Sequence, residues 1–164
     1  MLRLFCLSLA ALALGLVPAA TADSNGPKSS SQDFATGSAK FTAVDAHVIV
    51  DAHSGPAGED PQGHFALDQA GLIDYFADVT CLNVVGNQAV MGGVITKQKS
   101  GITGGVGTGV LQFVVDNGEP GTALPTPDRS VTIFTGAPPL ACPPPDPFPF
   151  FPVDQGNYVV NDAP

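Results

Sequence analysis

VTCLNVVGNQAVMGGVITKQKSGITGGVGTGVLQFVVDNGEPG, residues Val79–Gly121, is the stretch that decides the fold. Its apolar runs, each rich in β-forming residues, are Val79–Val85, Ala89–Thr96 and Val110–Val115. A Gly-Asn dipeptide at 86–87 joins the first two runs, and an Asn-Gly dipeptide at 117–118 follows the third. The stretch therefore predicts the centre of an antiparallel β domain, and it carries no catalytic signature.

Outward from this centre, alternating apolar and polar residues predict further strands, separated by short turn-rich connections. The expected strands are Ala35–Ala43, His47–His53, Gly63–Gln69, Ile73–Val85, Gln88–Gln98, Val110–Asp116, Arg129–Thr135 and Gln155–Val160. No helical period is sustained beyond two turns. We therefore expect an all-β fold, a single antiparallel barrel or sandwich of about seven to eight strands, connected mostly as an up-and-down meander.

The proline-rich segment Pro138–Pro152 is expected to stay outside the ladder, because proline has no backbone N–H to donate. It should run over the surface as extended, polyproline-like coil. Phe148, Phe150 and Phe151 lie within it, either as a patch for a partner or as staples that hold the segment on the β domain.

Residues 1–22 have the pattern of a secretory signal peptide. Arg3 supplies a positive charge, Leu4–Val17 is apolar, and Ala20-Thr21-Ala22 is a small-x-small cleavage site. The apolar run is shorter than the roughly 20 residues that a membrane span needs. The alternative is a buried N-terminal helix. We predict cleavage after Ala22, export, and no membrane insertion.

After cleavage, 142 residues remain (164 minus 22), enough for one domain with a core. Residues 23–33 are small and polar and are predicted to be a flexible linker, followed by a single β domain at 34–164. Removal of Arg3 leaves five Lys and Arg against 15 Asp and Glu. Such an acidic chain is not expected to bind nucleic acid or anionic lipid surfaces, which attract cationic patches.

Two cysteines, Cys81 and Cys142, follow the predicted cleavage site. In an oxidising compartment they are expected to form a disulfide, although two buried thiols are the alternative. The bond would close a loop of about 62 residues and stabilise the fold by roughly 4 kcal/mol on the chain-entropy model. It would also tie the proline-rich segment to the central strand.

Three segments carry a resemblance. AHSGPAGEDPQGHF (52–65), DVTCLNVVGNQAVMGG (78–93) and VVDNGEPG (114–121) are similar to corresponding segments in a group of exported, uncharacterised bacterial proteins. The similarity covers about two thirds of the exported chain. The resemblance implies secretion from a bacterium and a β fold, and it implies no activity.

The first candidate metal site is built around His53 and His64, which flank one loop and should be neighbours across a hairpin. Glu59, Asp60 or Asp51 would complete a His/His/carboxylate set of the kind that holds zinc. The alternative is that these histidines at strand ends face solvent.

The second candidate metal site is an oxygen-rich loop suited to calcium. Its residues are Asp116, Asn117, Glu119 and Asp128. The spacing does not match an EF-hand, and a plain turn capped by Asp116 explains the same residues. No cofactor other than zinc or calcium is suggested by the sequence.

The sequence favours a secreted, non-enzymatic β domain with a structural or binding role. A barrel of about eight strands can hold an apolar small ligand. We expect such a ligand, if the interior is not fully packed, among Phe65, Val79, Leu111 and Phe113. The alternative is a metal-binding protein or metal-dependent hydrolase that uses His53, His64 and nearby carboxylates. A surface partner is also compatible with the sequence.

Overall fold

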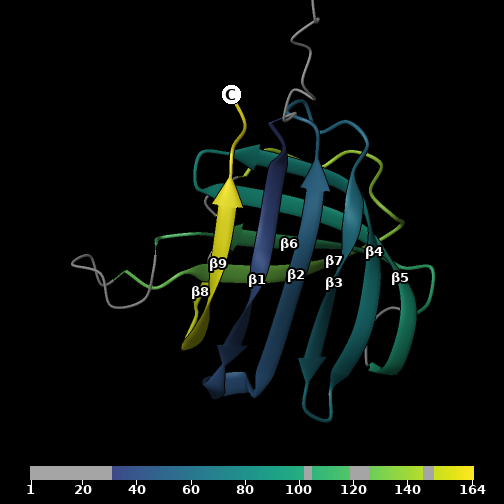
Figure 1. Cartoon of the computed structure of the whole chain (residues 1–164). Helices are drawn as coiled ribbons and strands as arrows, with labels where there is room; N and C mark the ends of the chain where they lie inside the picture. The colour runs from purple at the N-terminus through teal and green to yellow at the C-terminus, as the bar shows by residue number, and fades with distance from the viewer. Residues whose placement is uncertain (1–30, 102–104, 119–125, 146–149) are drawn as a thin grey trace, which may run out of the picture.

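The computed structural model describes residues 31–101, 105–118, 126–145 and 150–164 (Figure 1). The predicted signal peptide and residues 23–30 of the predicted linker lie outside these ranges. Asp33, which we had placed at the end of the linker, is the first residue of the first strand.

The described chain is built from β-strands and one turn of 3-10 helix. In order they are β1 (Asp33–Phe41), η1 (Thr42–Val44), β2 (Ala46–Ser54), β3 (Gln62–Gln69), β4 (Ile73–Val85), β5 (Gln88–Gly101), β6 (Gly109–Val115), β7 (Arg129–Gly136), β8 (Phe151–Pro152) and β9 (Gln155–Asn161). They form one 9-stranded antiparallel sheet of order β8-β7-β6-β5-β4-β3-β2-β1-β9. The predicted all-β class is confirmed, and β1 to β8 form an up-and-down meander with β9 returning beside β1.

The strand count differs from the prediction because the proline-rich segment contributes a strand. Phe151 and Pro152 form β8, which pairs with Ser130 and Arg129 of β7. Our expectation that the whole segment stays outside the ladder was therefore wrong. A proline is tolerated in an edge strand, where its missing N–H removes no ladder bond.

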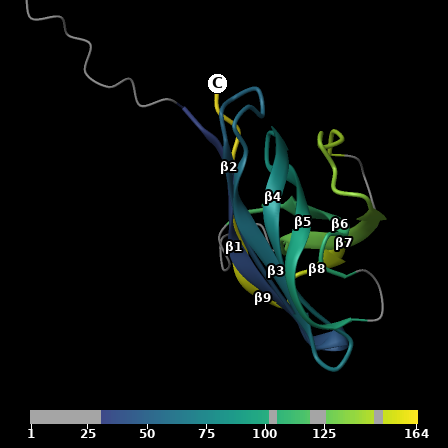
Figure 2. The same ribbon diagram turned by 90° about the vertical axis from the view of Figure 1, so that its right-hand side faces the viewer.

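The sheet curls into two layers. In Figure 1, β9, β1, β2 and β3 stand side by side in front, and β6 and β7 cross behind them. Figure 2 shows the same two layers edge-on. The long strands β4 and β5 pass from one layer to the other, and their pairing shifts register between Val79 and Cys81. Such bulges bend a strand and allow it to serve both layers.

The sheet is a half-barrel, not the closed barrel that we considered. The outer edge of β9 does not form a strand ladder with the second layer. Instead, Tyr158 N–H donates to Asp128 Oδ2 at 2.7 Å and Val160 N–H donates to Asp116 Oδ2 at 3.0 Å. Carboxylates thus take the places of the carbonyls that a closing strand would offer, and the edge of β9 is blocked.

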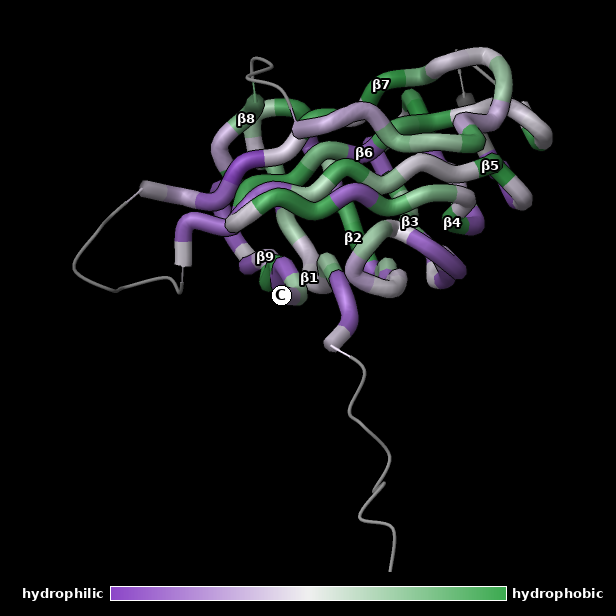
Figure 3. The backbone as a smooth tube through the Cα atoms, turned by 90° about the horizontal axis from the view of Figure 1, so that it is seen from above, coloured by the Kyte–Doolittle hydropathy of each residue, from purple (hydrophilic) through white to green (hydrophobic). Residues whose placement is uncertain are grey.

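The core lies between the layers. One face of each strand supplies it, because side chains alternate across a strand. Its largest fully buried apolar and aromatic members are Tyr75, Tyr158, Phe65, Met91 and Ile95. Figure 3 looks down on the layers and shows hydrophobic colour running through the strands of both.

The same alternation corrects our expected ligand set. Phe65 and Val79 face the core, but Leu111 and Phe113 lie on the opposite face of β6, where Val110 and Val114 are the core residues. Phe113 is nevertheless 1 % exposed, and its ring packs edge-on against Phe150 with centroids 6.4 Å apart. The four residues therefore do not line one interior cavity.

Candidate binding groove

The structure contains an apolar groove between the two layers. One side is formed by η1 and residues of β1 to β4, and the other by residues of β7 and β8. We call it the interlayer groove. Its cavity volume is about 430 Å³, within the range of pockets that bind small molecules. Its main apolar lining residues are Phe41, Val48, Leu67 and Ile73 from the first layer and Phe134 and Phe151 from the second.

The two rims of the groove expose apolar side chains. Val44, in η1, is 52 % exposed, and Phe151, in β8, is 62 % exposed. Phe134 is half-buried and packs edge-on against Tyr75, with ring centroids 5.7 Å apart. Exposed apolar residues gathered around a groove indicate a binding surface, whereas isolated ones do not.

A buried polar cluster lies against the second-layer side of the groove. Gln112 is fully buried, and its amide donates to Ser130 Oγ at 2.5 Å. Ser130 Oγ donates to the carbonyl of Phe113 at 2.9 Å, and Thr132 Oγ1 donates to Gln112 Oε1 at 2.6 Å. Ser130 and Thr132 also line the groove. Because these buried polar groups form hydrogen bonds with one another, the network holds the side chains on this side of the groove in place.

The hydroxyl groups of two buried tyrosines lie next to this polar cluster. The hydroxyl of Tyr75 approaches Thr132 and that of Tyr158 approaches Ser130, but neither reaches hydrogen-bond geometry. Burial raises the pKa of both phenols above the ordinary value, because the phenolate would lose its hydration. Both rings therefore remain uncharged over the neutral range.

The groove offers little charge to an occupant. Among its described lining residues, Asp154 is the one ionisable side chain. Its carboxylate accepts hydrogen bonds from the hydroxyl and the backbone N–H of Thr42, and these bonds lower the pKa of Asp154. An uncharged, apolar occupant fits this lining, and an anionic group inside it would find no cation there.

The histidine candidates lie on one outer face but are not brought together as ligands. Asp51 stands directly opposite His64 across β2 and β3, and His53 stands opposite Gln62. The His53 ring bonds to Asp51 Oδ1 at 2.8 Å. The His64 ring instead stacks on Phe76, with centroids 5.0 Å apart.

The acidic residues of the same candidate site have other partners or face away. Glu59 Oε2 accepts a hydrogen bond from Ala57 N–H at 2.8 Å, inside the loop between β2 and β3. Asp60 is exposed and adopts a positive φ of 50° in that loop. The loop therefore turns its carboxylates toward its own backbone or solvent.

The proposed calcium loop is organised by backbone amides. Asp116 Oδ1 accepts from Gly118 N–H at 2.8 Å, the turn cap that we gave as the alternative. Asp128 Oδ1 accepts from Asn117 N–H at 2.8 Å, and the second oxygens of both carboxylates hold β9. Glu119 lies outside the described residues. Across the described ranges, no group of three or more His, Cys, Asp or Glu side chains is placed to hold a metal ion.

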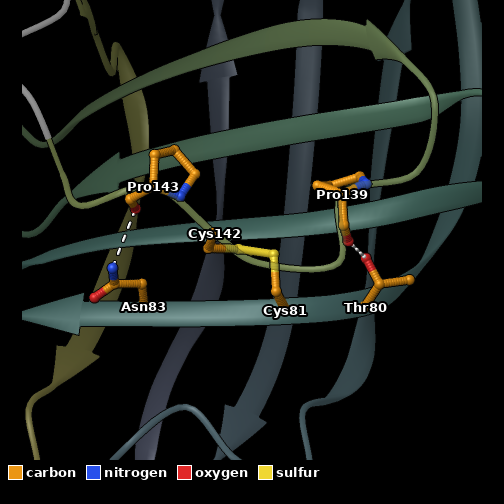
Figure 4. The surroundings of a disulfide bond; sticks show 6 residues. All are labelled: Thr80, Cys81, Asn83, Pro139, Cys142 and Pro143. Carbon is orange, nitrogen blue, oxygen red and sulfur yellow. Dashed lines mark hydrogen bonds between the residues drawn. A yellow bond between two sulfur atoms is a disulfide. The ribbon is translucent and has the colours of Figure 1, made fainter.

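The disulfide Cys81–Cys142 lies on the outer face, away from the groove (Figure 4). It ties residues 137–145, which we call the proline strap, across β4 and β5. Thr80 Oγ1 donates to the carbonyl of Pro139 at 2.6 Å, and Asn83 donates to that of Pro143 at 3.2 Å. The strap thus lies on the convex face, and the disulfide joins it to β4, the central strand to which we had predicted that it is tied.

Comparison with known proteins finds no matching family model, no matching curated sequence and no matching solved structure. Within the described residues, no helix is long and apolar enough to cross a membrane.

The sequence did not point to the interlayer groove. Its lining comes from two separate parts of the chain, residues 41–73 and 130–154, so no local motif marks it. The available signal was weak. Phe134 stands in a short strand between Ile133 and Thr135, and Phe151 stands within a proline-rich run.

Proposed function

We propose that this protein is an exported, non-catalytic β domain that binds an apolar ligand in the interlayer groove. The observation that carries the proposal is the groove itself, with apolar side chains on both layers and exposed apolar residues on both rims. The predicted signal peptide and the disulfide support export to an oxidising compartment.

The electrostatics of the groove support an uncharged ligand. Transferring an ion into an apolar site costs several kcal/mol unless a counter-charge is present. The only described ionisable lining residue, Asp154, already holds Thr42. A neutral, largely hydrocarbon ligand therefore has the best fit.

The metal-binding alternative has less support. Its two histidines are engaged with Asp51 and with Phe76. Elemental analysis of protein prepared without chelators tests it directly, and stoichiometric zinc or calcium would favour that alternative over the groove.

The proposed function is tested by titrating the protein with Nile red, an uncharged apolar dye whose fluorescence rises in apolar surroundings. We expect saturable binding at one site. Ala43→Trp adds bulk to an exposed lining position of the groove and should weaken binding by about tenfold, or about 1.4 kcal/mol.

Ala57→Trp is the matched control, because Ala57 is exposed in the loop between β2 and β3, outside the groove lining. It should bind the dye like the parent protein. Absence of saturable dye binding, together with no molecule co-purifying in native mass spectrometry, would refute the proposal.

A further inference from the structure

Another pocket, separate from the interlayer groove, lies beside the disulfide. We call it the strap pocket. Its cavity volume is about 440 Å³, and it is lined by the loop between β2 and β3, the end of β4 and the proline strap. Asp33, the first residue of β1, also lines it. No described residue lines both the strap pocket and the interlayer groove.

The strap pocket lies where β4 extends past β3. The pairing of β3 with β4 ends at Asp78, whereas β4 continues to Val85. The loop between β2 and β3 lies against this part of β4, since a Cβ on Gly58 would be 2.8 Å from the carbonyl oxygen of Leu82. The disulfide from Cys81 attaches the proline strap to the same part of β4. Strand, loop and strap are therefore in contact around the pocket.

Asp33 brings a carboxylate to this pocket. The residue is 2 % exposed, and aspartate is rarely buried to this extent without a charged partner. Its Oδ1 accepts a hydrogen bond from Ala163 N–H at 2.8 Å. Within the described part of the chain, its Oδ2 has no hydrogen-bond partner and its carboxylate forms no ion pair. Oδ2 keeps some contact with solvent, unlike the buried tyrosine hydroxyls.

The surroundings leave the charge of this carboxylate uncompensated. Burial raises the pKa of Asp33 above its ordinary value, and the negative charges of Asp162 and Glu59 raise it further, while the hydrogen bond from Ala163 opposes them only in part. No Lys, Arg or His is among the described residues that line the pocket. A cation bound beside Asp33 would therefore stabilise the ionised carboxylate.

The described hydrogen-bond donors around the pocket are already in use. Thr80 Oγ1 and Asn83 Nδ2 donate to carbonyls of the proline strap. Ala57 N–H and Gly58 N–H donate within their own loop. Asp33 Oδ2 thus remains as an acceptor for the ligand. A protonated primary amine has three N–H donors and no acceptor, so it complements this lining.

The rest of the lining suits a cation that carries a hydrocarbon chain. Pro56, Pro61 and Leu140 contribute apolar surface, and Leu140 is 91 % exposed at the mouth of the pocket. A bare metal ion has less support, because the described residues hold no group of three or more His, Cys, Asp or Glu side chains placed to bind one.

We propose that the strap pocket binds a primary alkylammonium group. Its N–H donors bond to Asp33 Oδ2, and its alkyl chain packs against Pro56, Pro61 and Leu140. Hydrogen bonds between an ammonium and a carboxylate are strengthened by both charges. The net charge of −9 attracts cationic ligands toward the protein. This site is independent of the proposed apolar ligand in the interlayer groove.

The test is an NMR titration of the exported chain with hexylammonium. The amide signals of Asp33 and Ala163 should shift saturably, and those of β7 should not. 1-Hexanol has a chain of the same length without the charge, and it should bind at least about tenfold more weakly. N-acetyl-lysine-methylamide distinguishes the sources of the ammonium group. Binding at least as tight as that of hexylammonium indicates a lysine side chain, and weaker binding indicates a free amine.

Two carboxylate variants separate a specific contact from general attraction to an acidic protein. Asp33→Asn keeps an acceptor for Ala163 N–H but removes the charge in the pocket, and it should weaken hexylammonium binding by about tenfold or more. Asp162→Asn is the matched control. Asp162 is exposed, lies outside the pocket lining and accepts from Gly86 N–H, for which asparagine also keeps an acceptor. Its replacement should weaken binding by no more than about twofold, because solvent screens an exposed charge.

A second pair of variants keeps this site distinguishable from the interlayer groove. Ala57→Trp adds bulk to the lining of the strap pocket and should weaken hexylammonium binding by about tenfold, with Nile red binding unchanged. Ala43→Trp should have the reverse effect, because Ala43 lines only the interlayer groove.

Two results would overturn the inference. One is equal affinity for hexylammonium and 1-hexanol. The other is equal weakening by Asp33→Asn and Asp162→Asn, which would indicate general electrostatic attraction. Saturable Nile red binding without hexylammonium binding would reject the ammonium site alone. Hexylammonium binding without Nile red binding would support the ammonium site and count against the proposed function.

Discussion

Individual residues stabilise this half-barrel at points where strands do not pair through backbone hydrogen bonds. Asp128 is 5 % exposed and accepts two backbone amides, Asn117 N–H and Tyr158 N–H. Gly92 lies beneath the proline strap, where it leaves room for the disulfide. Asp128 acts through its two acceptor oxygens, and Gly92 acts through its lack of a side chain.

Asp128→Asn should destabilise the protein by about 1–3 kcal/mol. The amide keeps one acceptor oxygen, but its NH₂ group then faces a backbone N–H that has lost its partner. Urea denaturation followed by far-UV circular dichroism measures the change. Asp68→Asn, at an exposed position of β3, is the matched control and should stay within about 0.5 kcal/mol of the parent. Equal losses in the two variants would contradict the role given to Asp128.

Gly92→Ala should destabilise the protein by about 1–3 kcal/mol through overpacking. A Cβ at this position would lie 2.5 Å from Pro139 Cγ and 2.6 Å from Cys81 Sγ. Gly105→Ala is the control, because its nearest neighbour would be Gln98 Oε1 at 3.8 Å, an ordinary contact. The measurement is the free energy of unfolding of each variant, compared with that of the parent protein. A Gly92 variant as stable as the parent would show that the strap is not closely packed there.

At the scale of elements, the proline strap lies outside the strands and is attached to β4 by the disulfide. Val90 and Phe113 point to the convex face yet are 0 % and 1 % exposed. The strap and Phe150 therefore provide cover that a further layer would otherwise supply. The disulfide holds this cover in place, because a proline-rich segment cannot hold itself by backbone bonds.

Replacing both cysteines, Cys81→Ser with Cys142→Ser, should lower stability by about 2–4 kcal/mol. The effect on motion should be local. NMR relaxation should show faster motion at Leu140 and Ala141 than in the parent, with β2 unchanged. The double variant avoids a free thiol that could pair between molecules. Equal loosening of β2 and the strap would indicate that the bond supports the whole sheet instead.

At the scale of the whole molecule, we expect the half-barrel to unfold as one unit. The strands β4 and β5 belong to both layers, so neither layer can unfold without disturbing the other. The chain has 2 tyrosines and no tryptophan. Both tyrosines are buried between the layers, at 2 % and 0 % exposure. Their ionisation therefore reports on the separation of the layers.

We expect alkaline unfolding and tyrosine ionisation to coincide. Burial holds the folded-state pKa of Tyr75 and Tyr158 above the unfolded value of about 10. The contribution of these two phenols to stability is therefore constant below this value and falls as pH rises above it. The tyrosinate absorbance should rise in a single step together with the loss of the far-UV signal.

Tyr75→Phe provides the control for that titration. It should halve the absorbance step and cost little stability, because the Tyr75 hydroxyl has no hydrogen-bond partner. Ionisation near the ordinary pKa, with the far-UV signal intact, would contradict the burial of these rings.

The sequence by itself determined the strands and their order along the chain. Alternation at His47–His53 and the run Ile73–Val85 identified β2 and β4 closely, because side-chain period and turn dipeptides are local properties. The two-residue strand β8 was missed, since only its neighbour β7 makes it a strand.

Only the tertiary structure decided that the sheet remains open, which side of β6 faces the core, and where the groove lies. Each depends on residues distant in sequence. Asp128 accepts a hydrogen bond from Tyr158 N–H. The bulge near Cys81 bends β4 and β5 from the first layer into the second. The groove arises where that second layer ends before the first one does. Such long-range geometry follows from curl and packing, which no local pattern encodes.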